Sequence, residues 1–100
     1  MRQVMIRYKV KPDRVQENEM LVRAVYEELQ RADPAGISYA TFQLDDGVSF
    51  VHLAQTEDGQ NPLARLEAFA RFQEDIGDRC EERPVLSEVR EIGSFRMFGR

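Results

Sequence analysis

The residue best suited to acid–base chemistry in this sequence is its one histidine, His52. It lies in the run VSFVHLA, residues 48–54, whose composition is typical of a β-strand. Imidazole changes its charge near neutral pH, so a histidine beside a bound ligand can take up or deliver a proton. We therefore predict that His52 is a catalytic residue. The competing interpretation is a buried histidine that is hydrogen-bonded to its neighbours.

The side chains that share a face with His52 are the predicted ligand-binding residues. The runs ISYATFQL and VSFVHLA are separated by Asp45-Asp46-Gly47, which is a strong hairpin signal. With an even-length loop, residues 39, 41 and 43 share one face with residues 50, 52 and 54, and aliphatic side chains occupy the other face. The predicted ligand-binding residues are Tyr39, Thr41, Phe50 and Tyr8. Strand propensity alone would also explain the tyrosines.

The first half of the chain predicts one strand and one helix that lead into this hairpin. Residues 3–11, QVMIRYKVK, alternate with period two, and Pro12 ends the run because proline cannot donate to a strand ladder. Residues 13–31 lack Gly and Pro and carry apolar side chains at helical spacing. Which face of the first strand points inward is left open.

After the hairpin, the sequence predicts a second helix and a last strand. Asn61-Pro62 is a favourable helix start, and the helix is predicted to continue through Ile76 and to end before Pro84. Residues 85–98 predict a strand that is kinked or bulged at Gly93.

The order of these elements predicts an α+β fold. Two strand-helix-strand units with right-handed crossovers give a ferredoxin-like βαββαβ sandwich, with a four-stranded antiparallel sheet and both helices on one face. We expect the uncovered face to carry His52, Tyr39 and Phe50. Because a monomer seldom exposes so large a part-apolar surface, the sequence predicts a homodimer formed through the open sheet face.

Composition bounds the remaining possibilities. The 100 residues predict a single domain, 1–100, and the net charge of −4 without a basic stripe argues against nucleic acid as a partner. No apolar run approaches the roughly 20 residues of a membrane span, so we expect no membrane partner. The single cysteine, Cys80, excludes an intrachain disulfide and a multi-cysteine metal site. We expect a cytoplasmic protein with no metal.

Three segments carry a resemblance to a known family: IRYKVKPDRVQENE, YATFQLDDGVSFVHLA and NPLARLEAFARFQ. Together they resemble the dimeric α+β barrel superfamily, and within it bacterial proteins related to the antibiotic-biosynthesis monooxygenases. The resemblance implies homodimerisation and cofactor-free oxygenation of aromatic or quinol-like substrates. Haem-degrading members use a tryptophan-containing site, and this chain has no tryptophan. No cofactor is therefore expected.

Three functions remain open at this point. The first is a homodimeric protein that binds a small aromatic or otherwise apolar molecule between sheet and helices, as a cofactor-free monooxygenase. The second is a non-catalytic dimeric module with a structural or ligand-binding role. The third is an isomerase or lyase that uses the same His52 without oxygen.

Overall fold

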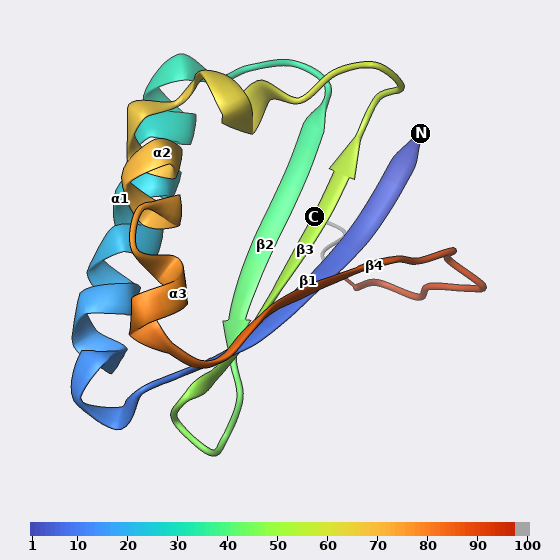
Figure 1. The fold of residues 1–100 in the computed structure, drawn as a ribbon. Coiled ribbons are helices and arrows are strands. Elements are labelled where there is room, and N and C mark those ends of the chain that lie inside the picture. Colours follow the sequence, from blue (N-terminus) through green and yellow to red (C-terminus); the bar gives the residue numbers. More distant parts are fainter. Residues whose placement is uncertain (98–100) are drawn as a thin grey trace.

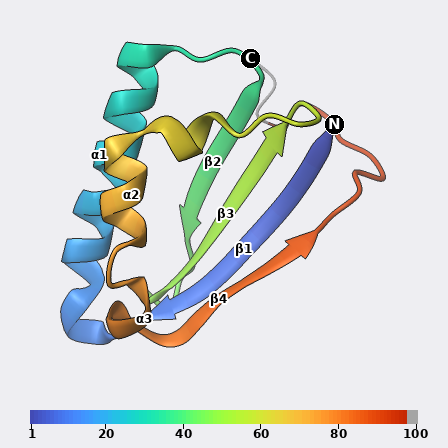
Figure 2. The same ribbon diagram turned by 45° about the horizontal axis from the view of Figure 1, so that its top comes forward.

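The computed structural model describes residues 1–97. The elements are β1 (Arg2–Val10), α1 (Val15–Ala32), β2 (Ile37–Gln43), β3 (Ser49–Thr56), α2 (Glu67–Gln73), α3 (Ile76–Arg79) and β4 (Cys80–Glu88), with short 3₁₀ turns η1 (Pro12–Arg14) and η2 (Pro62–Arg65). The strands pair antiparallel in the order β2-β3-β1-β4. All helices lie on one side of this sheet (Figure 1, Figure 2). The predicted ferredoxin-like α+β fold is confirmed.

The β2–β3 hairpin has the predicted even register, with Thr41 directly opposite His52. Gly47 adopts a φ of 78°, which glycine reaches without a steric penalty. The Asp46 carboxylate accepts the backbone N–H of Ser49 at 2.8 Å and its hydroxyl at 2.6 Å, which ties the loop to the start of β3. The turn chemistry and the face pattern therefore specify the same pairing.

The helices cover the face of the sheet that carries His52, so the prediction that this face is uncovered is wrong. Tyr8, Phe50 and His52 are 2%, 4% and 2% exposed, respectively. A mixed aromatic and polar face can be buried here because its polar atoms hydrogen-bond to one another. On β1, the inward side chains are those of Val4, Tyr8 and Val10. The opposite face, called the open face below, carries Met5, Arg7, Lys9, Ser38, Ala40, Phe42, Val51, Leu53 and Val85.

α1 is the long helix over the sheet. Its buried side carries Asn18, Val22 and Val25, while Glu19 and Arg23 form an ion pair at 2.7 Å towards solvent. The helix begins at residue 15 because the preceding residues form the turn η1. Among residues 1–97, no helix is both long enough and apolar enough to cross a bilayer.

The second helix is broken, whereas the sequence predicted a continuous one. Leu66 has an extended backbone (φ −91°, ψ 130°) that separates η2 from α2, and Asp75 has a left-handed one (φ 61°) before α3. Asn61 makes no side-chain cap. Instead, Glu28 of α1 accepts the backbone N–H of Ala68 at 2.8 Å, which satisfies a donor that the first turn of α2 leaves free.

The last strand lies earlier in the chain than predicted, at Cys80–Glu88. It includes Pro84, which the sequence pattern placed before the strand. β4 is an edge strand, and its pairing with β1 shifts register between Arg7 and Lys9, so a residue without an N–H is tolerated. Residues 89–97 lie outside any strand, and the end of the predicted strand at Phe98 lies outside the described residues.

Candidate functional site

His52 lies at the centre of β3, between β1 and β2, and both neighbouring strands direct side chains to it. It is opposite Ile6 on β1 and Thr41 on β2. Because side chains alternate across a strand, Tyr8 and Tyr39 fall on the same face of the sheet, within reach of the imidazole. The hairpin register is therefore what brings the predicted residues together.

Both nitrogens of the His52 ring are hydrogen-bonded. Nε2 lies 2.8 Å from Tyr8 Oη, and Nδ1 lies 2.6 Å from Tyr39 Oη and 3.2 Å from Thr41 Oγ1. Phe72 of α2 packs on the imidazole with a ring-centroid distance of 5.3 Å. The imidazole is thus enclosed and fully engaged.

The hydrogen bonds continue inward to two residues outside the predicted set of site residues. Asn18 Nδ2 donates to Tyr8 Oη at 3.0 Å, and Arg79 Nε donates to Asn18 Oδ1 at 3.0 Å. Asn18 is fully buried. An amide on an otherwise apolar helix stripe was the available signal. Arg79 gave none, because its neighbours in the sequence are those of an ordinary charged helix end.

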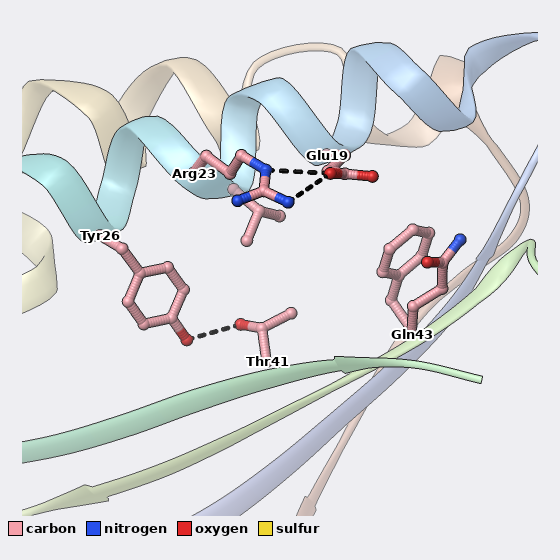
Figure 3. Close-up of a pocket in the computed structure, with 7 residues that line it drawn as sticks. Glu19, Arg23, Tyr26, Thr41 and Gln43 are labelled. Atoms are coloured by element: carbon pink, nitrogen blue, oxygen red, sulfur yellow. Dashed lines mark hydrogen bonds and ion pairs between the residues drawn. The ribbon is translucent and has the colours of Figure 1, made fainter.

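The hydrogen bonds also continue outward to a surface hollow. Tyr26 Oη of α1 lies 2.7 Å from Thr41 Oγ1 (Figure 3). Beside this pair lies a hollow of about 290 Å³, called the α1 hollow. Its lining residues are Glu19, Val22, Arg23, Tyr26, Thr41, Gln43 and Phe50. The connected residues, Arg79, Asn18, Tyr8, His52, Tyr39, Thr41 and Tyr26, are called the buried relay.

The predicted site residues occupy different places relative to this hollow. Thr41 and Phe50 line it, whereas His52, Tyr8 and Tyr39 are not among its lining residues. His52 therefore reaches a ligand there only through the Thr41 hydroxyl. The catalytic and binding roles of these residues stay predictions.

Burial keeps the relay uncharged except at Arg79. It lowers the pKa of His52 from 6.5 to about 4, and it raises the pKa of the Tyr8 and Tyr39 phenols. At neutral pH the imidazole is neutral and both phenols keep their protons. The members of the relay near the hollow can therefore donate and accept hydrogen bonds while they remain uncharged.

The described residues offer no evident metal centre. Within residues 1–97, no three His, Cys, Asp or Glu side chains come together in a way that could hold a metal ion. The polar groups that the site brings together are the hydroxyls, the imidazole, the Asn18 amide and the Arg79 guanidinium.

Solved structures with the same fold include proteins described as antibiotic biosynthesis monooxygenases. One superimposes with a TM-score of 0.71 at 18% sequence identity, covering 93% of this chain and 100% of that protein. A candidate enzyme of this kind from Bacteroides thetaiotaomicron gives a TM-score of 0.79 at 14% identity, covering 96% and 94% of the two chains. Another, from Nitrosomonas europaea, gives 0.76 at 16% identity, covering 93% and 100%.

The likeness is one of fold. At these identities it confirms the architecture that the sequence resemblance implied, and it leaves the reaction to be argued from the site. The chain matches no protein-family model, and no curated protein matches it.

Proposed function

We propose that the α1 hollow binds a small aromatic or otherwise apolar molecule that carries an oxygen atom, and that the protein oxidises this molecule with O₂ without a cofactor. The observation that carries the proposal is the buried relay, which connects a fully buried cation to hydroxyl groups at the edge of a hollow. The proteins with the same fold that are described as monooxygenases support the reaction class.

The lining of the hollow suits such a ligand. Val22 and Phe50 supply apolar surface, and Tyr26 and Thr41 place hydroxyl groups next to each other. A volume of about 290 Å³ is at the lower end of the range for small-molecule pockets, roughly 300–1,000 Å³. A ligand of one or two rings, with its oxygen against the two hydroxyls, fits these constraints.

A cofactor-free oxygenation needs an electron-rich substrate that reacts with O₂ itself. For a methylene group conjugated to an aromatic hydroxyl, loss of a proton gives an anion whose electrons pass to O₂ and form a carbon–oxygen bond. The resulting peroxide takes up a proton and loses water, so that CH₂ and O₂ become C=O and H₂O. Atoms and electrons balance without an external reductant.

In this reaction the relay stabilises charge and moves a proton. Hydroxyl donors aimed at an anionic oxygen stabilise it more strongly in a partly desolvated site than in water. Thr41 and Tyr26 would contact the substrate directly. The substrate would bind as its anion, with its proton lost to solvent, and His52 would act behind these hydroxyls as the acid that delivers a proton through Thr41.

The test is oxygen consumption with a panel of phenols and quinols that carry a conjugated methylene group, followed by product mass in isotopically labelled O₂. The proposal predicts a product that has gained one labelled oxygen atom and lost two hydrogens. Thr41→Val should reduce turnover about tenfold or more, because a hydrogen bond to a charged oxygen is lost. Thr56→Val, at the far end of β3, is the matched control and should leave turnover unchanged. A panel without labelled product would reject the oxygenase proposal.

A non-catalytic dimeric module is the second candidate, and the completeness of the relay favours it. Among the described residues, no buried side-chain polar atom lacks a hydrogen-bond partner. A fully satisfied network of this kind is sufficient to hold the sheet to the helices without any catalytic role. Ligand binding in the α1 hollow without any turnover, unchanged by the presence of O₂, would support this function instead.

We further propose that two copies associate through the open face. Phe42 is 41% exposed and Val85 is 64% exposed, beside the half-buried side chains of Met5, Val51 and Leu53. A hollow of about 460 Å³ lies on this side, between the sheet and residues 89–91. An apolar surface of this kind is typical of an interface.

Light scattering after size-exclusion chromatography tests the association. The wild-type protein is expected to have the mass of a dimer. Leu53→Glu should give a folded monomer, because a carboxylate would be buried in the interface without a partner. Gln30→Glu, on the exposed side of α1, adds the same charge and should remain dimeric. A monomeric wild-type protein would contradict the proposal.

A further inference from the structure

Arg79 is a buried cation without a carboxylate partner. It is 1% exposed, and no carboxylate within residues 1–97 forms an ion pair with it. Its guanidinium donates to Asn18 Oδ1 and to the backbone carbonyls of Phe72 and Glu74, at 3.0, 2.7 and 3.3 Å. It also lies over the Phe72 ring, 5.3 Å from the centroid. The guanidinium has five N–H donors and no acceptor, so it fixes the direction of every bond it makes.

Arg79 fixes the orientation of the Asn18 side-chain amide. Since the guanidinium can only donate, the amide oxygen of Asn18 must face it. The amide nitrogen then faces Tyr8 Oη, to which it donates at 3.0 Å. The opposite amide orientation would set an N–H against the guanidinium N–H.

The Asn18 amide in turn fixes which group donates in the hydrogen bond between Tyr8 and His52. Tyr8 has one phenolic proton, and its oxygen already accepts from Asn18. The proton is therefore free to bond with the other neighbour of the oxygen, His52 Nε2 at 2.8 Å. Nε2 accepts this hydrogen bond, so a neutral imidazole carries its own proton on Nδ1. The Nδ1–H then donates to Tyr39 Oη, and more weakly to Thr41 Oγ1.

The reverse assignment leaves one bond unmade. If His52 carried its proton on Nε2, Tyr8 Oη would accept from both Asn18 and His52. The Tyr8 proton would then have no acceptor at either contact, in a side chain that is 2% exposed. An unsatisfied buried donor makes such an arrangement roughly tenfold or more less populated.

We propose that Arg79 is a positioning residue that holds His52 as the Nδ1–H tautomer. Acting through Asn18 and Tyr8, it makes the relay a donor in the direction of Tyr39, Thr41 and the α1 hollow. A cation at the inner end thus determines how an imidazole at the centre of the sheet presents its proton.

The tautomer also selects the ligand, a consequence that rests on the proposed function. With Nδ1–H donating outward, the imidazole does not take up the Thr41 proton. One hydroxyl proton of the Thr41–Tyr26 pair joins the two side chains, and the other can donate to a ligand. The hollow therefore favours an acceptor oxygen, such as a phenolate, an enolate or a carbonyl.

The test is the ¹⁵N–¹H correlation spectrum of the His52 ring in the ligand-free protein. The chain has one histidine, so its ring signals need no further assignment. The wild-type protein is expected to show the Nδ1–H tautomer at neutral pH, at least about tenfold over the other. Because no ligand or O₂ is involved, this result can stand even if no oxygenase activity is found.

Asn18→Asp tests whether the contact with Arg79 determines the tautomer of His52. A carboxylate beside Arg79 stays ionised and can only accept, so Tyr8 must donate to it and can accept only from His52. The tautomer should change to Nε2–H. Asn61→Asp makes the same chemical change at an exposed position and should leave the spectrum unchanged.

A wild-type protein with Nε2–H would overturn the proposal. So would a folded Asn18→Asp variant with an undiminished Nδ1–H preference.

Discussion

The stability of the protein should depend on pH in mildly acidic solution, and His52 should dominate this dependence. Burial lowers the pKa of His52 from 6.5 to about 4 in the folded protein. The folded state thus favours the neutral imidazole, and between these two pH values the unfolded chain binds more protons than the folded one. The stabilisation is complete above the ordinary pKa of 6.5 and is lost as the pH falls towards 4.

The size of the effect follows from the difference between the two pKa values. One unit corresponds to about 1.4 kcal/mol, so the free energy of unfolding should fall by about 3 kcal/mol over this interval. This is a large fraction of the roughly 5–15 kcal/mol by which a domain is usually stable.

Urea denaturation from about pH 7.5 to pH 4.5 measures this loss, at one protein concentration so that association does not vary. The control is His52→Gln, which cannot titrate. The exposed carboxyls of Glu17 and Asp46, whose hydrogen bonds lower their pKa values, are present in both proteins and cancel in the comparison. The wild-type curve should fall more steeply than that of the variant. Parallel curves would show that the buried imidazole is protonated as easily as a solvated one, and would refute the reasoning.

Five further substitutions should separate buried polar contacts from exposed ones when the free energy of unfolding is measured in urea. Tyr8→Phe leaves two buried partners unsatisfied and should cost about 2–4 kcal/mol, whereas Tyr26→Phe, which breaks one bond of a half-buried phenol, should cost about 1 kcal/mol. Glu28→Ala removes the side chain that caps α2 and should lower the free energy of unfolding by about 1 kcal/mol. Glu27→Ala, at the exposed neighbouring position, should change it little. Arg23→Ala breaks an exposed ion pair and should change stability by less than about 0.5 kcal/mol; a larger loss would mean that this pair is more than a surface contact.

The hairpin and its contents could be predicted from the sequence because the evidence for them is local. Asp46-Gly47 specifies the turn, and alternation along the two strands specifies which side chains share a face. This is why Tyr39 and Thr41 were correctly grouped with His52. Alternation does not say which face the helices cover, and the more aliphatic face is the uncovered one.

The inner half of the relay depends on contacts between residues far apart in the sequence. Arg79 meets Asn18 across most of the chain, and neither residue belongs to a motif. A buried guanidinium becomes understandable only when its acceptors, which include backbone carbonyls at the end of α2, are known. The same holds for the breaks at Leu66 and Asp75, where tertiary contacts override a helical pattern.

β4 shows how tertiary position decides the effect of a proline. Read locally, Pro84 separates a helix from a strand. At the edge of a sheet with irregular pairing, its missing N–H costs little, and the strand continues through it.

The central claim is that the α1 hollow is a ligand site with hydroxyl donors supplied by the buried relay. Spectrophotometric titration with 4-nitrophenol tests it directly, because the absorption spectrum distinguishes the phenol from the phenolate. We predict saturable binding that favours the phenolate and that weakens about tenfold or more in Thr41→Val, with no change in Thr56→Val. Equal affinity and equal spectra for the wild-type protein and Thr41→Val would contradict the claim.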